Sequence, residues 1–134
     1  MKSPLAVAAS ALLLSVLLAA CGGDDQPAVC SSAKDLKAAI DDFTSIDVTS
    51  SNGLADLKEG LTNVRDDLTQ LKSDASSEFS SQVDAVDAAV STLTASLKAA
   101  ADEPNGSNLA AVVSAVPAVT SSVKTLVTDV QDTC

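Results

Sequence analysis

The sequence has 134 residues, enough for one small domain, and its 18 acidic against 8 basic residues give a formal net charge of −10. Phosphates of nucleic acids and anionic lipid headgroups repel so acidic a chain, so we expect it to bind no nucleic acid. The chain also contains no histidine, tyrosine or tryptophan. Because catalysis needs a positioned base, nucleophile or metal ion, we expect no enzyme activity and no metal site.

The chain opens with a basic residue followed by an apolar run. Lys2 supplies the positive charge, and Leu5 to Leu18 are all apolar or small residues. This run is shorter than the roughly 20 residues that a permanent membrane-spanning helix needs. It ends in Leu18-Ala19-Ala20-Cys21, and glycines and aspartates follow. This arrangement is typical of a cleaved export signal.

The Leu-Ala-Ala-Cys segment resembles the lipobox of bacterial lipoproteins. The resemblance implies a diacylglyceryl group on the sulfur of Cys21, with no other cofactor, and signal peptidase cleavage between Ala20 and Cys21. It places the protein on the extracytoplasmic face of the cell membrane, with the lipid as its anchor. An ordinary secretory signal cut elsewhere and an uncleaved N-terminal anchor remain alternatives. We divide the chain into a signal peptide (1–20), a lipidated cysteine with a flexible tether (21–29) and a helical domain (30–134).

The three cysteines form an odd count until Cys21 is assigned to the lipid. Cys30 and Cys134 then remain, and an even remainder in an exported protein indicates a disulfide. Closing a loop of this size would stabilise the fold by roughly 4.7 kcal/mol in the chain-entropy model. A metal-binding pair is the alternative, but the sequence offers no histidine and no third thiol to complete such a site.

Two helices are predicted in the first half of the helical domain. Ser32-Ala33-Lys34-Asp35 matches a capping box, so we expect the first helix to run from about Ser32 to Thr44 or Ile46. Ser51 or Asn52 is expected to cap the second helix. Gly60 lies beside the apolar stripe of that helix and costs up to about 1 kcal/mol relative to alanine unless it admits a close helix contact. The apolar positions repeat at three-four spacing: Val29, Ala33, Leu36, Ile40 and Phe43 in the first helix; Leu54, Leu57, Leu61, Val64, Leu68, Leu71 and Ala75 in the second.

A slip in the apolar register near residues 73–81 predicts a turn before the third helix, and Ser77 or Ser81 is expected to cap that helix. One continuous helix from 53 to 101 is the alternative. Pro104 and Asn105-Gly106 predict a break before the fourth helix, which we expect to bend but not to stop at Pro117. The apolar positions are Val83, Val86, Val90, Leu93, Leu97 and Ala100, and then Leu109, Val112, Val116, Val119, Val123, Leu126 and Val130.

Four amphipathic segments joined by short loops predict an all-α fold, an antiparallel up-down-up-down four-helix bundle. The cysteines support an even number of helices. An even number returns the C-terminus to the end where the first helix begins, so Cys30 and Cys134 would be neighbours. Three helices would hold these two cysteines a helix length apart.

The composition and layout also resemble the small, alanine-rich, acidic secreted lipoproteins of high-GC Gram-positive bacteria. Asp41, Asp42 and Asp47, and likewise Asp66 and Asp67, could offer oxygen ligands to Ca²⁺, but none lies in a calcium-loop pattern, so we interpret them as solvated. Phe43 and Phe79 are predicted to be core residues. The leading hypothesis is a non-catalytic protein-interaction or structural module of the cell envelope with an unidentified protein partner. The alternative is a carrier that holds a small apolar ligand between its helices.

Overall fold

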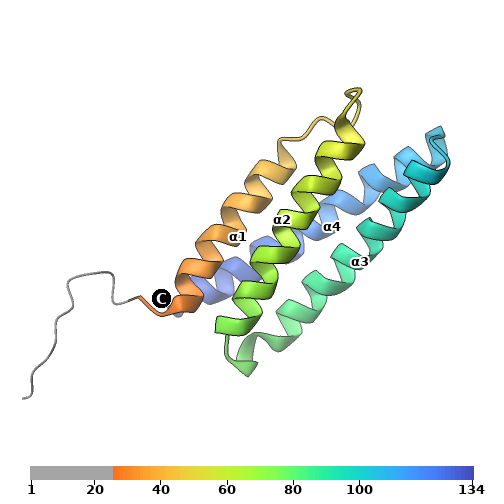
Figure 1. The fold of residues 1–134 in the computed structure, drawn as a ribbon. Coiled ribbons are helices and arrows are strands. Elements are labelled where there is room, and N and C mark those ends of the chain that lie inside the picture. Colours follow the sequence, from red (N-terminus) through yellow and green to blue (C-terminus); the bar gives the residue numbers. More distant parts are fainter. Residues whose placement is uncertain (1–25) are drawn as a thin grey trace, which may run out of the picture.

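The computed structural model describes residues 26–134, and within them it contains four helices and no strand (Figure 1). The helices are α1 (Ala28–Thr44), α2 (Gly53–Asp74), α3 (Ser80–Asp102) and α4 (Gly106–Gln131), and a short 3-10 helix, η1 (Ser77–Phe79), precedes α3. The predicted cleavage site at Ala20 and Cys21 lies outside the described residues. The all-helical prediction is confirmed, and so is the turn that separates α2 from α3.

Each long helix packs against two others. α1 contacts α2 and α4, and α3 contacts α2 and α4, whereas in residues 26–134 the backbones of α1 and α3, or of α2 and α4, make no close approach. The helices therefore form a ring of four around one core (Figure 1). Contact is most extensive between α3 and α4 and least extensive between α2 and α3.

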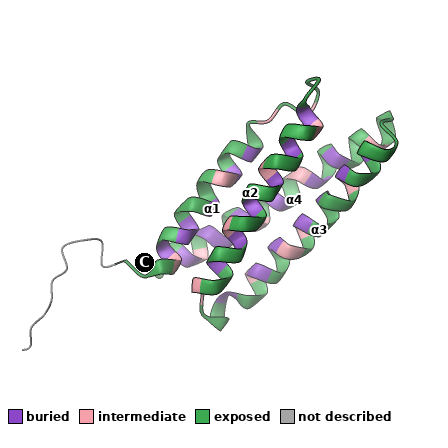
Figure 2. Ribbon diagram, viewed as in Figure 1, coloured by how far each residue is buried: buried purple, intermediate pink, exposed green. Residues whose placement is uncertain are grey.

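The core consists of one apolar stripe from each helix, and the opposite faces are exposed (Figure 2). Phe43 and Phe79 are both buried, as predicted. Aliphatic side chains supply the rest, and burying each Val or Leu contributes about 1.5–3 kcal/mol. The predicted stripes are buried almost throughout α1, α2 and α3, and the buried members are Ala33, Leu36, Ile40, Leu57, Leu61, Val64, Leu68, Leu71, Val83, Val86, Val90, Leu93, Leu97 and Ala100.

The stripe predicted for α4 is wrong at Leu109, whereas Val112 is buried as predicted. Leu109 is 37% exposed, and Val116 is only partly buried. Ala115 is buried instead. Val112, Ala115 and Val119 keep helical spacing as well as Val112, Val116 and Val119 would, so periodicity alone could not decide between them.

Two of the predicted helix starts are also wrong. α1 begins at Ala28, directly after Pro27, whose φ of −52° suits the entry to a helix and whose carbonyl accepts from the Cys30 amide at 2.9 Å. Ser32 therefore lies inside α1 and caps nothing. α3 follows η1 without a gap, so neither Ser77 nor Ser81 caps it. Asn52 does precede α2, as predicted, although its side chain makes no capping hydrogen bond.

Gly60 lies at a close helix contact, and Pro117 does not end α4. A Cβ at Gly60 would lie 2.9 Å from Ile46 Cδ1 and 3.1 Å from Phe43 Cδ2, so glycine permits the close approach of α1 to α2. α4 continues through Pro117, which is exposed. Proline has no N–H, so the carbonyl of Val113 loses its helical partner at a position open to water.

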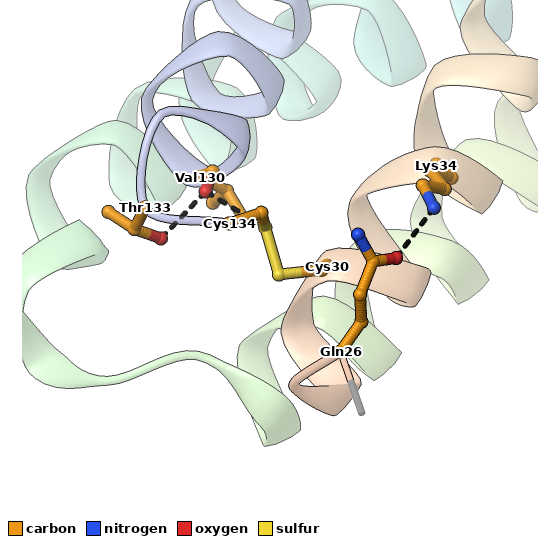
Figure 3. The surroundings of a disulfide bond; sticks show 6 residues. All are labelled: Gln26, Cys30, Lys34, Val130, Thr133 and Cys134. Atoms are coloured by element: carbon orange, nitrogen blue, oxygen red, sulfur yellow. Dashed lines mark hydrogen bonds between the residues drawn. A yellow bond between two sulfur atoms is a disulfide. The ribbon is translucent and has the colours of Figure 1, made fainter. Parts of the chain in front are cut away.

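Three links join the two ends of the chain and the turn between α2 and α3 at one end of the bundle. Ser32 Oγ, near the start of α1, donates to Asp74 Oδ2 at the end of α2 at 2.6 Å. Gln82 Nε2, near the start of α3, donates to Asp129 Oδ2 near the end of α4 at 3.0 Å. A disulfide joins Cys30 to Cys134, with the two Cα atoms 6.1 Å apart (Figure 3). We call this the disulfide end.

Replacing Cys134 with serine should lower the stability of the oxidised protein by up to about 4.7 kcal/mol, because the unfolded chain is then no longer closed into a loop. Cys134 is exposed and Cys30 is buried, so the change at Cys134 leaves the core intact. Thermal melts followed by circular dichroism, with and without reductant, measure the effect. The variant and the parent should melt alike when reduced; an equal loss under both conditions would show that the two cysteines are not bonded.

Candidate functional site

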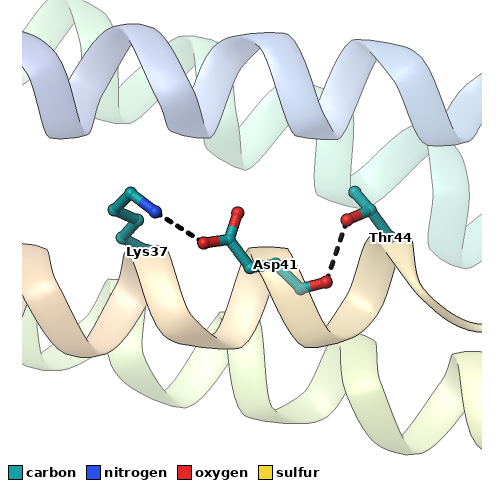
Figure 4. Close-up of polar contacts among 3 residues, drawn as sticks. All are labelled: Lys37, Asp41 and Thr44. Atoms are coloured by element: carbon teal, nitrogen blue, oxygen red, sulfur yellow. Dashed lines mark hydrogen bonds and ion pairs between the residues drawn. The ribbon is translucent and has the colours of Figure 1, made fainter.

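Asp41 and Asp47, which the sequence places close together, each have hydrogen-bond partners of their own. Asp41 pairs with Lys37 at 2.6 Å, and its carbonyl accepts from Thr44 Oγ1 at 2.9 Å (Figure 4). Asp47 accepts from both the amide and the hydroxyl of Thr49, and these bonds lower the pKa of its carboxyl. In residues 26–134, no three carboxylates or thiols are placed to hold one metal ion.

Several threonine hydroxyls inside the helices bond to the carbonyl four residues back and do not point into a shared site. Thr62, Thr69, Thr92 and Thr120 all bond in this way. Such bonds occupy the hydroxyl with its own backbone. These side chains therefore form no group with a neighbouring base.

A groove between α2 and α3 has the dimensions of a ligand site and an apolar lining. Its volume is about 450 Å³, within the range of about 300–1,000 Å³ that is usual for small-molecule pockets. It runs along the first half of α2 and the last third of α3. Of the neighbouring pairs of long helices, α2 and α3 have the least extensive contact. Its lining consists of Leu54, Lys58, Leu61, Thr62, Arg65, Thr94, Leu97, Lys98, Ala101 and Asp102.

The groove combines an apolar floor with a charged rim. Leu61 and Leu97 are 4% and 7% exposed, so they form the floor. Lys58, Arg65 and Lys98 lie on the exposed faces of the two helices and line the same space. Their alkyl stems can cover apolar surface while the charged ends stay in water. The groove thus offers an apolar surface with positively charged side chains beside it.

Basic residues are scarce in this chain, so three of them around one groove make that part of the surface locally positive. Within the described residues, Lys58 and Arg65 make no ion pair. Lys98 pairs with Asp102 at 2.6 Å, and this hydrogen-bonded carboxylate raises the pKa of the lysine. Three positive charges and one negative charge line the groove, in a chain whose net charge is −10.

The exposed surface of α2 separates its charges by sign. Lys58 and Arg65 line the groove toward α3. Glu59, Asp66 and Asp67 line two depressions toward α1. These acids do not offset the positive charge of the groove at close range, because they lie on the opposite flank of the helix.

The depression between α1 and α2 is acidic, and we call its four aspartates the acidic face: Asp35, Asp42, Asp66 and Asp67. Partial burial raises the pKa of the Asp67 carboxyl, and the nearby charges of Asp35 and Asp66 raise it further. Each effect disfavours the ionised form of Asp67. The acidic face is therefore a place where like charges are held together at neutral pH.

The groove was not predicted from the sequence, because its basic residues are far apart along the chain. Lys58 and Arg65 are seven residues apart, which is two helical turns, so their spacing puts them on one face of α2. That signal was present in the sequence. Lys98 joins them only through the packing of α3 on α2, which no local pattern indicates.

One described helix, α4, is long and apolar enough to span a membrane by length and composition, with a mean hydropathy of 1.5 over its most apolar stretch. The core helix of a soluble protein meets the same criterion, and the buried face of α4 packs on α3 and α1. Comparisons with known protein families, with curated proteins and with solved structures gave no match to this chain.

Replacing Asp67 with asparagine should raise the melting temperature at pH 7. The raised pKa means that the folded protein favours the protonated carboxyl. Its favourable contribution is complete below the unfolded pKa of 3.8 and is lost as the pH rises through the folded pKa. The gain from the substitution should therefore shrink toward pH 3. Thermal melts at both pH values test this, with Asp132→Asn at the exposed C-terminal end as the control; a gain that does not depend on pH would contradict it.

Proposed function

We propose that the protein is a lipid-anchored extracytoplasmic lipoprotein whose helical bundle is a non-catalytic interaction module of the cell envelope. The lipobox-like segment ending at Cys21 supports the anchor. The acidic face supports an interaction role, because four aspartates on two helices present concentrated negative charge to a partner protein.

We also infer an antiparallel up-down-up-down order for the four helices. The hydrogen bond from Ser32 to Asp74 brings the start of α1 to the end of α2. The bond from Gln82 to Asp129 brings the start of α3 to the end of α4. The disulfide then joins the start of α1 to the C-terminal residue. These three links support the inference.

A second candidate function, ligand carriage, is favoured by the groove between α2 and α3. The groove has the volume of a small-molecule site, although it is open and lies at the edge of the bundle. A carrier of this design would hold its ligand between two helices on the surface. It would not enclose the ligand in the core.

Replacing Cys21 with serine should abolish lipid labelling and release the protein from the membrane fraction, or leave it as an unprocessed precursor, because serine cannot form the thioether. Metabolic labelling with a fatty acid and cell fractionation measure both effects. Ala28→Ser makes a matched exposed change beyond the motif and should keep the protein on the membrane. Retention and processing of Cys21→Ser like the parent would refute the anchor.

The interaction role is tested by capturing envelope proteins with the anchored chain and with the double variant Asp66→Asn, Asp67→Asn. The parent should retain a partner that the double variant loses, because the variant removes half of the charge of the acidic face. Asp132→Asn should retain it. A partner captured equally by all three proteins would place the interface elsewhere, and capture of none would contradict the role.

A further inference from the structure

We propose that the groove between α2 and α3 binds a small amphiphile with one alkyl chain and an anionic headgroup, such as a carboxylate or a phosphate monoester. The inference rests on the carrier role, the second candidate function, and names its ligand class. The apolar floor of Leu61 and Leu97 would hold the chain. The rim of Lys58, Arg65 and Lys98 would hold the headgroup.

The net positive charge of the groove favours a negatively charged headgroup. Outside the groove, acidic residues of the described chain outnumber basic ones overall, and on α2 Glu59, Asp66 and Asp67 line the opposite flank. Lys58 and Arg65 have no acidic partner within the described residues. An anionic headgroup would supply that missing partner, and charge-assisted hydrogen bonds of this kind are stronger than neutral ones. A cationic headgroup would be repelled.

The dimensions of the groove suit one alkyl chain. Leu54 to Arg65 extend over about 16 Å of α2, at about 1.5 Å per residue. The groove provides about 450 Å³ along this length, which is within the range usual for small-molecule pockets.

The position of the groove indicates the side from which the ligand would enter. The groove begins at the start of α2 and the end of α3, away from the disulfide end. If Cys21 carries the anchor, the short tether keeps the disulfide end next to the membrane. The groove then lies toward the end of the bundle that is farther from the membrane, and the amphiphile would be taken up from the aqueous side.

The test uses residues 26–134, which contain every core residue described and the disulfide, after circular dichroism has shown that this domain is helical. The probe is dodecanoate below its micelle concentration, titrated calorimetrically. Acetate carries the charge without the chain, and dodecyltrimethylammonium carries the chain with the opposite charge. We expect saturable binding of dodecanoate alone.

Variants then locate the site. Lys58→Gln and Arg65→Gln should each weaken dodecanoate binding by about tenfold, the usual effect of losing one charged hydrogen bond. Lys124→Gln removes the same charge from α4, outside the groove, and should leave the affinity unchanged. Ala101→Phe adds bulk at an exposed groove position and should abolish binding while the domain stays folded.

Several results would overturn the inference. These are no saturable binding, equal binding of the cationic amphiphile, or equal losses from Lys124→Gln and Lys58→Gln. Binding of an acidic helical peptide without binding of dodecanoate would assign the groove to a protein partner. The anchor is measured separately through Cys21→Ser in cells, so failure in the groove leaves the anchor proposal intact, and failure of the anchor leaves the binding result intact.

Discussion

The contact between α1 and α4 is the constraint on which the rest of the structure depends. It joins the first and last helices, which no loop connects, and the disulfide holds the same pair together at one end. A ring of four helices has four edges, and three of them are formed by extensive contact. The fourth, between α2 and α3, is where the ring is least tightly closed, and it contains the groove.

Charge helps to explain why that edge differs along its length. Close to the turn, Lys72 on α2 pairs with Asp87 on α3 at 2.8 Å, which draws the helices together and raises the pKa of the lysine. Farther from the turn, Lys58 and Arg65 on α2 lie along the same groove as Lys98 on α3. On the α3 wall Lys98 pairs with Asp102 of the same helix, so within the described residues no ion pair joins α2 to α3 at the groove. One end of the edge is thus joined by an ion pair between the helices, and the end with the groove is not.

The sequence predicted the helices well and their first residues poorly. Three-four spacing in α1, α2 and α3 identified the buried stripes, because burial against a neighbour depends on the face of a helix and not on its ends. Capping patterns at Ser32 and Ser81 failed because other groups begin those helices: Pro27 precedes α1, and η1 leads into α3. Asn105, read only as part of a turn, caps α4 by accepting from the Asn108 amide at 2.9 Å.

The candidate site was harder to predict from the sequence than the fold. The net charge is a property of the whole chain, whereas a ligand contacts only one part of the surface. The overall balance of −10 argues against anionic partners, yet a charge exposed to salt water is screened beyond about 8–10 Å. An anion inside the groove would therefore respond chiefly to the groove's own charges, which are three positive and one negative, and weakly to the acidic face on the other flank of α2. The two surfaces can then serve different binding events on the same small bundle, because one helix separates them.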